Sequence, residues 1–441
     1  MKFFIKKLGC PKNDVDGDYI AGMLLDHGFK RVERDVDADI VIINTCGFIL
    51  PARQESVNEI IYYENLKKEG LIRSLFVTGC LSQRYGAEIL RETDCIDGIF
   101  GIGQLEQLLH AISGQSIPGL GKNLGEPADM KYLAGRSRFV DGNYPYEYVK
   151  ISDGCDRFCS YCAIPNIRGR YRSRPLEDIV EEAELLASKG KKELILVSQE
   201  GTAYGKDFED AVSIMTLLKR LEQVSGIEWI RLMYLHPESI TDELIEFMSG
   251  SERVLGYYDI PLQHINDRIL SKMNRGITRT EIEALIERIR DYSSENIIRT
   301  TFIVGFPGET DAEFLELEEG VARLALDRMG VFVYSVEAGT PAANFGRRVP
   351  EAVAQERQNI LMNLQQEIAF RKNIALIGTT QKVIIDESEL GTPAVGRSQG
   401  DCPEIDQTVI IKNSRVRAGD IVNAKIVMAD GYDLIATVGE R

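Results

Sequence analysis

The chain contains the stretch Asp153-Gly154-Cys155-Asp156-Arg157-Phe158-Cys159-Ser160-Tyr161-Cys162, in which three cysteines follow a Cys-x3-Cys-x2-Cys pattern. Cysteine thiolates are the usual protein ligands of iron–sulfur clusters, and a four-iron cluster takes four of them. Three closely spaced thiolates leave one iron without a protein ligand, and an open position distinguishes catalytic metal sites from structural ones. The stretch therefore predicts a catalytic four-iron cluster. The alternatives are a chance spacing or a partial zinc site.

The composition of the chain favours a globular cytoplasmic protein with several domains. Its 441 residues are too many for one compact core, so we expect two to four domains. The apolar start of the chain is broken by Lys6 and Lys7, and no small-residue cleavage site follows, so we expect no signal peptide. No apolar run approaches the roughly 20 residues of a membrane span. Eight cysteines in such a chain indicate metal binding or catalysis rather than disulfides.

The first part of the chain predicts an open parallel α/β domain over residues 1–112. Short β-rich apolar runs alternate there with segments of helical periodicity. The expected strands are Lys2–Leu8, Ile40–Asn44 and Leu75–Thr78, and the expected helices are Asp16–His27 and Gln54–Glu69. Such alternation is typical of a parallel sheet with helices on its faces. Residues 113–146 are rich in Gly and Pro without periodicity, which predicts a linker.

The central part of the chain, residues 147–345, repeats a strand and a helix six times. The expected strands are Tyr148–Ser152, Leu194–Gln199, Trp229–Tyr234, Tyr257–Leu262, Ile298–Gly305 and Gly330–Tyr334. The expected helices include Leu176–Lys189, Ala211–Val224, Thr280–Tyr292 and Asp311–Ala325. Six such units predict a partial (β/α)6 barrel, whose site should lie at the carboxyl ends of the strands.

The last part of the chain predicts a connecting helix over 346–377 and a small antiparallel β-barrel over 378–441. The expected strands of this barrel are short and separated by turn residues. They are Lys382–Asp386, Val409–Lys412, Ile421–Met428 and Leu434–Val438.

A second set of three cysteines lies in the N-terminal domain. Cys10, Cys46 and Cys80 each follow an expected strand, and the carboxyl ends of parallel strands meet at one edge of a sheet. Neighbouring strands are about 4.8 Å apart, close enough to share one cluster. Glycines beside the cysteines would allow close backbone approach. We predict a second three-thiolate iron–sulfur site; three buried structural cysteines are the alternative. Cys95 and Cys402 have no partner pattern, so we expect structural thiols.

The chain resembles the methylthiotransferase family of radical S-adenosylmethionine (SAM) enzymes over nearly all 441 residues. Tyr161 before the last cysteine of the central motif matches that superfamily, and the C-terminal barrel is similar to a TRAM domain. Four segments resemble the RimO branch: Leu8-Gly9-Cys10-Pro11-Lys12-Asn13, Asn44-Thr45-Cys46-Gly47-Phe48-Ile49, Thr78-Gly79-Cys80-Leu81-Ser82-Gln83-Arg84-Tyr85 and Tyr258-Asp259-Ile260-Pro261-Leu262-Gln263-His264. The tRNA-modifying branch tends to have a Gly-Cys-Gln-Met-Asn type sequence at its first cysteine, which is absent here. One departure from RimO is Gln199-Glu200-Gly201-Thr202, where that branch usually has Asp and two Thr.

The resemblance implies an enzyme that adds a methylthio group to the β-carbon of an aspartate in a small-subunit ribosomal protein. It implies two [4Fe–4S] clusters, on the Cys155 set and on the Cys10 set. The first would cleave SAM reductively to a 5′-deoxyadenosyl radical, and the second would deliver sulfur, so SAM is both methyl donor and radical source. An electron donor such as flavodoxin or ferredoxin is implied, and no catalytic residue is expected beyond the clusters.

SAM is expected at the carboxyl ends of the barrel strands. Ser198 and Gln199 end the second strand and resemble the family's site for the methionine amino group. Ile303 and Gly305 end the fifth strand, where glycines would admit the adenine; a plain turn is the alternative. Tyr161 completes the expected contacts. His236 and His264 also follow strands, and we expect structural roles for them, with a polar cavity as the alternative.

Charge favours a protein substrate over tRNA. The chain has 52 basic and 68 acidic residues, a net charge of −16, and residues 378–441 have a net charge of −3. A barrel that grips RNA should be basic, whereas acidic residues such as Asp401, Glu404 and Asp406 suit a basic ribosomal protein. The basic run Arg168–Arg174 is expected to touch RNA or to pair with carboxylates or SAM. The alternative functions are a tRNA adenosine methylthiotransferase and a non-catalytic iron–sulfur protein.

Overall fold

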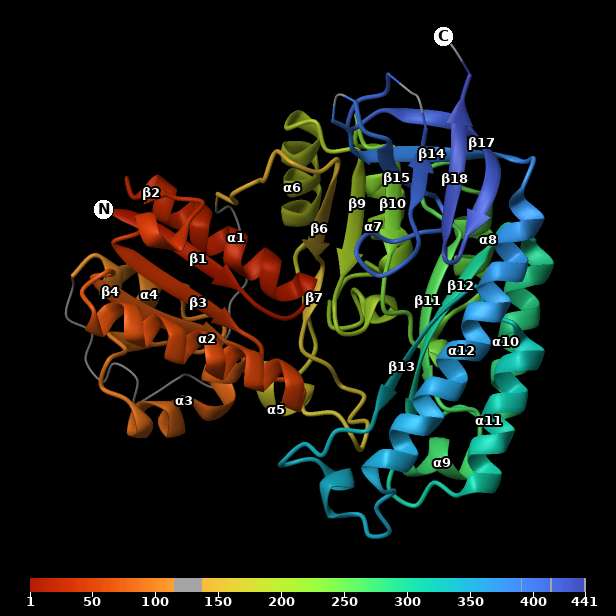
Figure 1. Ribbon diagram of the computed structural model, residues 1–441, viewed down its shortest axis with the longest axis horizontal. Coiled ribbons are helices and arrows are strands. Elements are labelled where there is room, and N and C mark those ends of the chain that lie inside the picture. Colours follow the sequence, from red (N-terminus) through yellow and green to blue (C-terminus); the bar gives the residue numbers. More distant parts are fainter. Residues whose placement is uncertain (115–136, 390, 413–414, 440–441) are drawn as a thin grey trace. The chain divides into compact units, whose positions relative to one another are not determined.

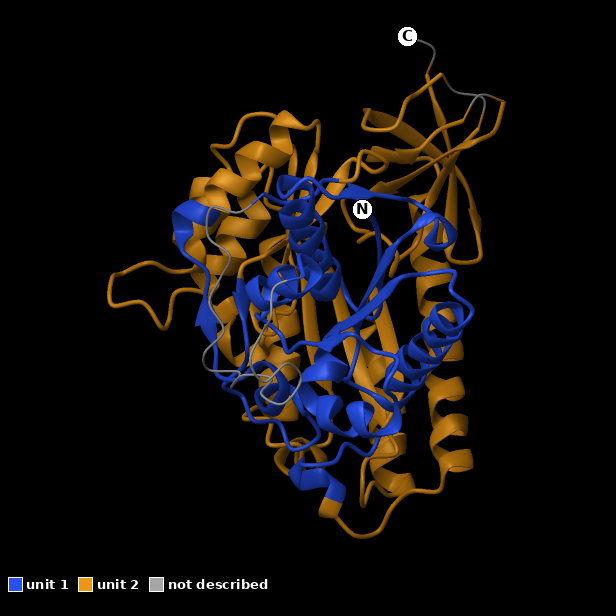
Figure 2. Ribbon diagram, turned by 90° about the vertical axis from the view of Figure 1, so that its left-hand side faces the viewer, with its two compact units in different colours: residues 1–140, 152–178, 335–343 blue, residues 141–151, 179–334, 344–441 orange. Residues whose placement is uncertain are grey.

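A computed structural model of the protein describes residues 1–114, 137–389, 391–412 and 415–439 (Figure 1). These form two compact units (Figure 2). Unit 1 comprises residues 1–140, 152–178 and 335–343, and unit 2 comprises residues 141–151, 179–334 and 344–441. Much of the predicted linker 113–146 lies outside the described residues. Within the described ranges, no helix is long and apolar enough to cross a membrane.

Unit 1 is built on a five-stranded parallel sheet, which confirms the prediction of an open α/β domain. The strand order is β2-β1-β3-β4-β5, with β1 at Lys2–Lys7, β2 at Lys30–Arg31, β3 at Ile40–Thr45, β4 at Ser74–Gly79 and β5 at Gly98–Ile99. The helices are α1 (Pro11–Asp26), α2 (Leu50–Lys68), α3 (Cys80–Glu92) and α4 (Leu105–Ile112). Every residue of β3 is buried, as expected for the centre of a parallel sheet. Ile60 and Tyr63 of α2 share one core with Val41 and Ile43 of β3.

Two further segments belong to unit 1. Residues 152–178 contain α5 (Ile164–Arg168) between two short antiparallel strands, β7 (Ser152–Asp153) and β8 (Arg172–Ser173). Ala163 and Ile167 pack with Ile102 and Cys80 in one apolar cluster. Residues 335–343 are fastened to α3, because Arg84 donates to the Glu337 carboxylate at 2.8 Å and to the Ala338 carbonyl at 2.7 Å.

Unit 2 contains six parallel strands in chain order, which confirms the partial (β/α)6 barrel. They form the sheets β6-β9-β10 and β11-β12-β13, and an isolated parallel bridge pairs Ile230 of β10 with Val254, which precedes β11. The strands are β6 (Tyr146–Lys150), β9 (Glu193–Val197), β10 (Trp229–Leu232), β11 (Tyr257–Gln263), β12 (Ile297–Val304) and β13 (Arg328–Val333). The helices are α6 (Leu176–Ser188), α7 (Ile214–Leu221), α8 (Asp242–Gly250), α9 (Asp267–Lys272), α10 (Arg279–Tyr292) and α11 (Asp311–Leu324).

The C-terminal part of unit 2 is a long helix, α12 (Glu351–Leu376), followed by a closed five-stranded barrel. Its strands are β14 (Thr380–Glu387), β15 (Ala394–Ser398), β16 (Val409–Ile411), β17 (Ile421–Asp430) and β18 (Asp433–Val438). Strand β15 was not predicted. The strand order is β14-β15-β16-β18-β17, and β16 pairs with β18 in parallel. The expectation of a wholly antiparallel barrel is therefore wrong for that one ladder.

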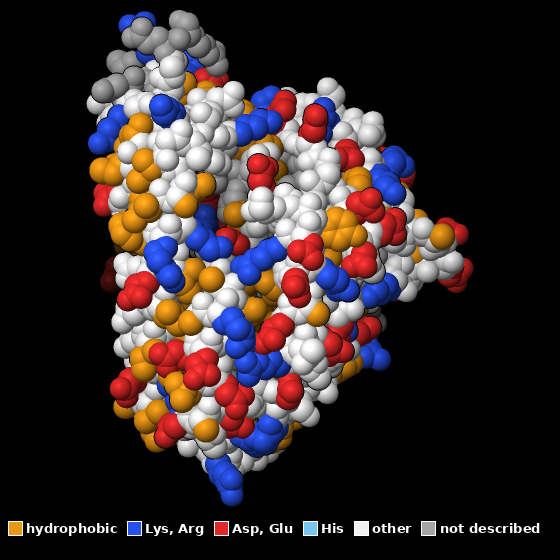
Figure 3. Space-filling model, turned by 90° about the vertical axis from the view of Figure 1, so that its right-hand side faces the viewer, with side chains coloured by type: hydrophobic (Ala, Val, Ile, Leu, Met, Phe, Trp, Pro, Cys, Tyr) orange, Lys and Arg blue, Asp and Glu red, His pale blue; other side chains and the backbone are white. Residues whose placement is uncertain are grey.

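Two carboxylates that we expected on the surface of the C-terminal barrel instead bind side chains of the preceding six-stranded part of unit 2. Asp401 is fully buried, and Arg328 of β13 donates to it at 2.6 Å. Asp406 accepts a 2.5 Å bond from the Tyr257 hydroxyl, and its side chain is only 2% exposed. The expectation that Asp401 and Asp406 recognise a substrate is therefore wrong, because buried ion pairs occupy both. On the face of unit 2 drawn in Figure 3, basic and acidic side chains are intermixed.

Candidate functional site

The N-terminal cysteines lie at the carboxyl ends of three neighbouring strands. Cys10 follows β1 and is the N-cap of α1. Cys46 follows β3, and Cys80 is the first residue of α3, directly after β4. Because β1, β3 and β4 are adjacent and parallel, their carboxyl ends open at the same edge of the sheet. This is the edge at which parallel α/β sheets bind their ligands.

Glycines beside these cysteines allow the three strand ends to meet. A Cβ atom on Gly9 would lie only 2.8 Å from Cys46 Sγ. A Cβ atom on Gly47 would lie 2.8 Å from the Cys80 carbonyl oxygen. The residue after Cys46 therefore touches Cys80, and the residue before Cys10 touches Cys46. The prediction that glycines permit close approach at this edge is confirmed.

Two polar side chains fix the backbone around this cysteine set. Asn13 of α1 donates to the carbonyls of Leu8 and Thr45, both at 3.0 Å, so it ties the ends of β1 and β3 together. The Ser56 hydroxyl accepts from the Cys46 amide and donates to the Cys46 carbonyl, both at 3.0 Å. These bonds satisfy backbone groups that would otherwise be unpaired in a buried loop.

Two thiols of the N-terminal set, those of Cys46 and Cys80, are buried. Burial raises the pKa of Cys46 to about 12 and also raises the pKa of Cys80, so binding a metal would release their protons. In the part of the chain that the structure describes, no three His, Cys, Asp or Glu side chains are grouped to hold one metal ion.

The second set, Cys155, Cys159 and Cys162, lies on a loop that is closed by backbone bonds. The Cys155 amide donates to the Gly169 carbonyl at 3.1 Å, and the Cys162 amide donates to the Cys159 carbonyl at 3.0 Å. Gly154 has φ +78°, and a Cβ there would lie 2.0 Å from the Arg170 carbonyl oxygen. The Ala342 amide donates to the Ser160 carbonyl at 2.8 Å. The loop is therefore held from both sides within unit 1.

The expected SAM contacts are divided between the units. Tyr161 belongs to unit 1, whereas Ser198, Gln199, Ile303 and Gly305 belong to unit 2. Ser198 is buried directly after β9, and Gln199 is half-buried beside it. Gly305 follows β12 with φ +73°, and a Cβ there would lie 2.5 Å from the Ala354 Cβ of α12. Packing against α12 by itself requires a glycine at this position.

Three successive strands of unit 2 end in a residue with positive φ. Tyr234 follows β10 with φ +60°, Gln263 ends β11 with φ +72°, and Gly305 follows β12. The pairing of β11 with β12 also shifts register between Ile260 and Gln263. Strained residues and bulges cluster at functional edges of sheets. The buried Gln263 Oε1 has no hydrogen-bond partner in the described structure, which makes Gln263 a ligand candidate that the sequence did not single out.

The two histidines near strand ends have different surroundings. His264 is fully buried, and its Nδ1 accepts a 2.9 Å bond from the Asn266 amide. Burial lowers its pKa to about 3, so the imidazole is neutral. His236 is also buried, with its Nδ1 3.4 Å from the Glu238 carboxylate. Cys402 is buried at the base of the C-terminal barrel, where burial raises its pKa.

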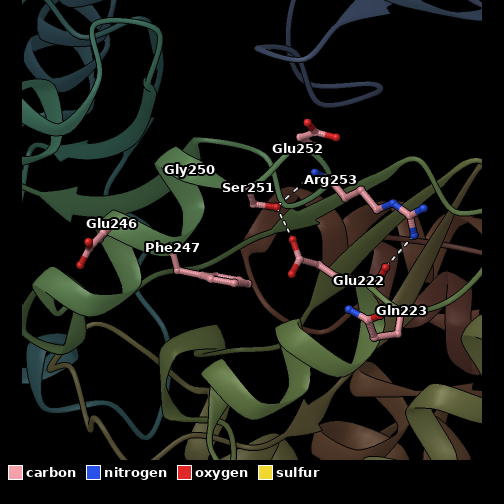
Figure 4. A pocket seen from close by; sticks show the side chains of 8 residues that line it. All are labelled: Glu222, Gln223, Glu246, Phe247, Gly250, Ser251, Glu252 and Arg253. Carbon is pink, nitrogen blue, oxygen red and sulfur yellow. Dashed lines mark hydrogen bonds between the residues drawn. The ribbon is translucent and has the colours of Figure 1, made fainter.

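A surface hollow of about 510 Å³ lies elsewhere in unit 2. The ends of α7 and α8 form it, and both Arg253 and Ser251 bond to Glu222 there (Figure 4). These helix ends lead into the amino ends of β10 and β11. Active sites of (β/α) barrels lie at the opposite, carboxyl edge, so this hollow is not the expected SAM site.

Known proteins and family models are similar to this chain over nearly its whole length. A model of the radical SAM superfamily matches residues 149–320, one of the uncharacterized protein family UPF0004 matches residues 2–101, and one of the TRAM domain matches residues 377–438. A ribosomal protein uS12 methylthiotransferase RimO of Thermosipho africanus is 44% identical over 100% of both chains. The protein of the same name from Desulfitobacterium hafniense is 42% identical over 99% of this chain and 98% of its own.

The chain belongs to the RimO family of methylthiotransferases. It is therefore a radical SAM methylthiotransferase, a transferase, and the family resemblance drawn from its motifs is confirmed. Membership of the radical SAM superfamily implies SAM and a [4Fe–4S] cluster. A solved structure of the radical SAM methyltransferase TsrM from Kitasatospora setae has the same fold, with a TM-score of 0.54 and 16% identity over 86% of this chain and 78% of that one.

One buried arginine contacts Cys80 of the first cysteine set and Asp153, which stands two residues before the second set. Arg168 lies at the end of α5 with its side chain 1% exposed. It donates to both Asp153 oxygens at 2.9 and 3.1 Å, and to the Asn13 amide oxygen at 2.7 Å. Its Nη2 also lies 3.5 Å from Cys80 Sγ. From the sequence, we expected the basic run 168–174 either to touch RNA or to pair with carboxylates or SAM. In the structure, Arg168 pairs with carboxylates.

Proposed function

We propose that the protein adds a methylthio group to the β-carbon of an aspartate in a basic small-subunit ribosomal protein. The observation that carries this proposal is the full-length similarity, at 42–44% identity, to proteins named ribosomal protein uS12 methylthiotransferase. All three parts of the chain are covered by that similarity. The proposal gives the two cysteine sets, the barrel and the terminal domain one common task.

The six cysteines are proposed as ligands of two [4Fe–4S] clusters. Cys155, Cys159 and Cys162 would hold the cluster that binds SAM, and Cys10, Cys46 and Cys80 would hold the second. When bound, these groups supply reductive cleavage of SAM and a sulfur atom for transfer. Both donor sets fit such groups, because each consists of three thiols on a backbone made rigid by hydrogen bonds.

The protein's own residues bind, orient and exclude water. Cys46, Cys80 and Cys159 are all less than 10% exposed, and a dry site strengthens every electrostatic interaction within it. Asn13 and Ser56 hold the strand ends, while Gly154 admits the Arg170 carbonyl behind the second loop. Tyr161, Ser198, Gln199, Ile303 and Gly305 are proposed as SAM contacts, and we add Gln263 for its buried amide oxygen.

Partners and boundaries complete the proposal. An acidic carrier such as flavodoxin or ferredoxin would supply electrons, and tRNA is not expected as a substrate. We propose domain limits of 1–112 for the N-terminal domain, 147–345 for the barrel, 346–377 for the connecting helix and 378–441 for the TRAM-like barrel. The family matches to residues 2–101, 149–320 and 377–438 support this division.

Mass spectrometry tests the substrate. Ribosomal proteins from cells with and without the gene are compared for a methylthio mass increment on one aspartate, and tRNA nucleosides from the same cells are compared in parallel. We expect the increment on a small-subunit protein only when the gene is present. A methylthioadenosine that depends on the gene, with unchanged ribosomal proteins, would contradict the proposal.

Variants of the anaerobically purified enzyme test the cluster assignment. Changing Cys155, Cys159 and Cys162 together to Ala should halve the iron content and abolish SAM cleavage. Changing Cys10, Cys46 and Cys80 to Ala should also halve the iron but leave SAM cleavage in place while methylthiolation stops. An unchanged iron content in either variant would refute that ligand set.

A further inference from the structure

Arg168 is a buried cation that lies beside the N-terminal cysteine set. Its Nη1 donates to both carboxylate oxygens of Asp153, at 2.9 and 3.1 Å. Its Nη2 lies 2.7 Å from Asn13 Oδ1 and 3.2 Å from Asp16 Oδ2. Only 1% of the side chain is exposed. Burying a cation is costly unless it is paired and hydrogen-bonded, and here both Nη1 and Nη2 have carboxylate or amide acceptors.

The same guanidinium reaches a sulfur of the N-terminal set. Arg168 Nη2 lies 3.5 Å from Cys80 Sγ, and the Cys80 sulfur lies 3.7 Å from Asn13 Oδ1. Ile167, next to Arg168, packs with Cys80 and Ile102 in one fully apolar cluster. The position of Cys80 is therefore set by an arginine and an asparagine rather than by its own helix alone.

The other end of Arg168 is anchored beside the second cysteine set. Asp153 stands two residues before Cys155 in the chain, and it is held in the short pairing of β7 with β8. The geometry thus forms a continuous chain of contacts from Cys80 through Arg168 to Asp153. All members of the chain lie in unit 1.

We propose that Arg168 is a positioning residue that tunes the N-terminal iron–sulfur site: its N–H group donates to the Cys80 sulfur, and its charge stabilises the reduced, more negative cluster. This rests on the proposed function, which places a cluster on Cys10, Cys46 and Cys80. Hydrogen bonds to the sulfurs and local charge set the reduction potentials of such clusters. Lysine cannot replace the residue fully, because an ammonium lacks the planar fork that serves Asp153, Asn13 and Cys80 together.

The test isolates the N-terminal cluster in the full-length chain. In a background with Cys155, Cys159 and Cys162 changed to Ala, we compare Arg168→Met and Arg168→Lys with the unchanged background. Iron content is measured first, and the midpoint potential is then measured by a redox titration followed by electron paramagnetic resonance. Arg138→Met is the matched control, because Arg138 is another buried arginine of unit 1, paired with Asp18 at 3.0 Å.

We expect Arg168→Met to shift the one-electron reduction equilibrium at least tenfold toward the oxidised cluster, a fall of about 59 mV in potential. Arg168→Lys should shift it less in the same direction, and Arg138→Met should not shift it. Full iron with an unshifted potential in both Arg168 variants would overturn the role. Loss of iron from the Arg168 variants alone, in chains that still fold, would support the role of Arg168. An equal loss of iron from Arg138→Met would overturn that role.

The outcome also separates this proposal from the one on which it rests. A background protein that holds no iron at all would overturn the N-terminal cluster and the role of Arg168 together. A loaded cluster with a potential insensitive to position 168 would overturn only the role of Arg168. Neither measurement depends on the identity of the methylthiolated substrate.

Discussion

Replacing Asp401 by alanine should remove a large part of the stability of unit 2. Asp401 is fully buried, and Arg328 donates to it through Nη2 at 2.6 Å and Nε at 3.0 Å. The Ser398 hydroxyl donates to its other oxygen at 2.5 Å. The Arg328 side chain is only 11% exposed, so alanine would leave a nearly buried guanidinium without its anion. Breaking such a pair costs about 3–5 kcal/mol, against a total of about 5–15 kcal/mol for a typical domain.

Trp229 provides the assay for this change. It is the only tryptophan of the chain and is fully buried in β10 of unit 2, so its fluorescence reports unfolding of that unit in urea. The control is Glu389→Ala, which removes an exposed carboxylate of the same barrel and should stay within about 0.5 kcal/mol. If Asp401→Ala unfolded at the urea midpoint of the parent, or if Glu389→Ala lost as much, the internal role of Asp401 would be refuted.

Two further predictions concern buried features of the two units. Burial lowers the pKa of His264 from 6.5 to about 3. Below pH 6.5 the unfolded chain therefore binds a proton that the folded chain does not, and the free energy of unfolding decreases as the pH is lowered. The variant His264→Gln lacks this group, so its free energy of unfolding should decrease by about 2 kcal/mol less than that of the parent between pH 8 and pH 5. Urea unfolding at both pH values measures this difference. Equal decreases in both proteins would contradict the prediction. Gly79 has φ +99° and leaves no room for a Cβ, which would lie 2.5 Å from the Thr45 carbonyl oxygen. Gly79→Ala should therefore displace Cys80 and lower the iron content toward half, whereas Gly28→Ala, at φ +79° in open space, should retain it; full iron in Gly79→Ala would argue against the close contact.

The elements that the sequence predicted best are those whose apolar residues are nearly continuous. Strands β3 and β4 lie within one residue of their expected ends, because buried parallel strands need apolar residues on both faces. Helix starts were less accurate. Ser213 is the N-cap of α7 and bonds to Thr216, so the helix begins after it rather than at Ala211. Residue Pro11 starts α1, five residues earlier than expected, because proline suits the first turn of a helix.

Strand β15 was missed because its pattern is hidden by a charge. Arg397 lies inside the barrel wall, where Asp386 and Glu193 neutralise it at 2.7 and 2.8 Å. A strand of five residues with a central glycine and a buried arginine has no apolar alternation to recognise. One of its charge partners, Glu193, lies far away in the sequence, so only the folded chain identifies it.

The net charge of the C-terminal barrel gave a wrong prediction of which carboxylates face a substrate, for a related reason. A sum over the sequence counts every carboxylate as exposed, but Asp386, Asp401 and Asp406 are all bonded to cations or hydroxyls inside unit 2. Asp401 and Asp406 pair with Arg328 and Arg299 of the preceding strands, and Asp386 pairs with Arg397 within the barrel itself. If the substrate is basic, as proposed, only the carboxylates that remain exposed, such as Glu389 and Asp430, are available to attract it.

The placement of both cysteine sets in one compact unit carries a consequence for the proposed chemistry. In the sequence, Cys80 and Cys155 fall into different predicted domains, 1–112 and 147–345, with the expected linker between them. In the structure, residues 152–178 belong with the N-terminal sheet, and Arg168 connects Asp153 to Cys80 through bonds of 2.9 and 3.5 Å. The distance between a sulfur source and a radical source would then be fixed inside unit 1.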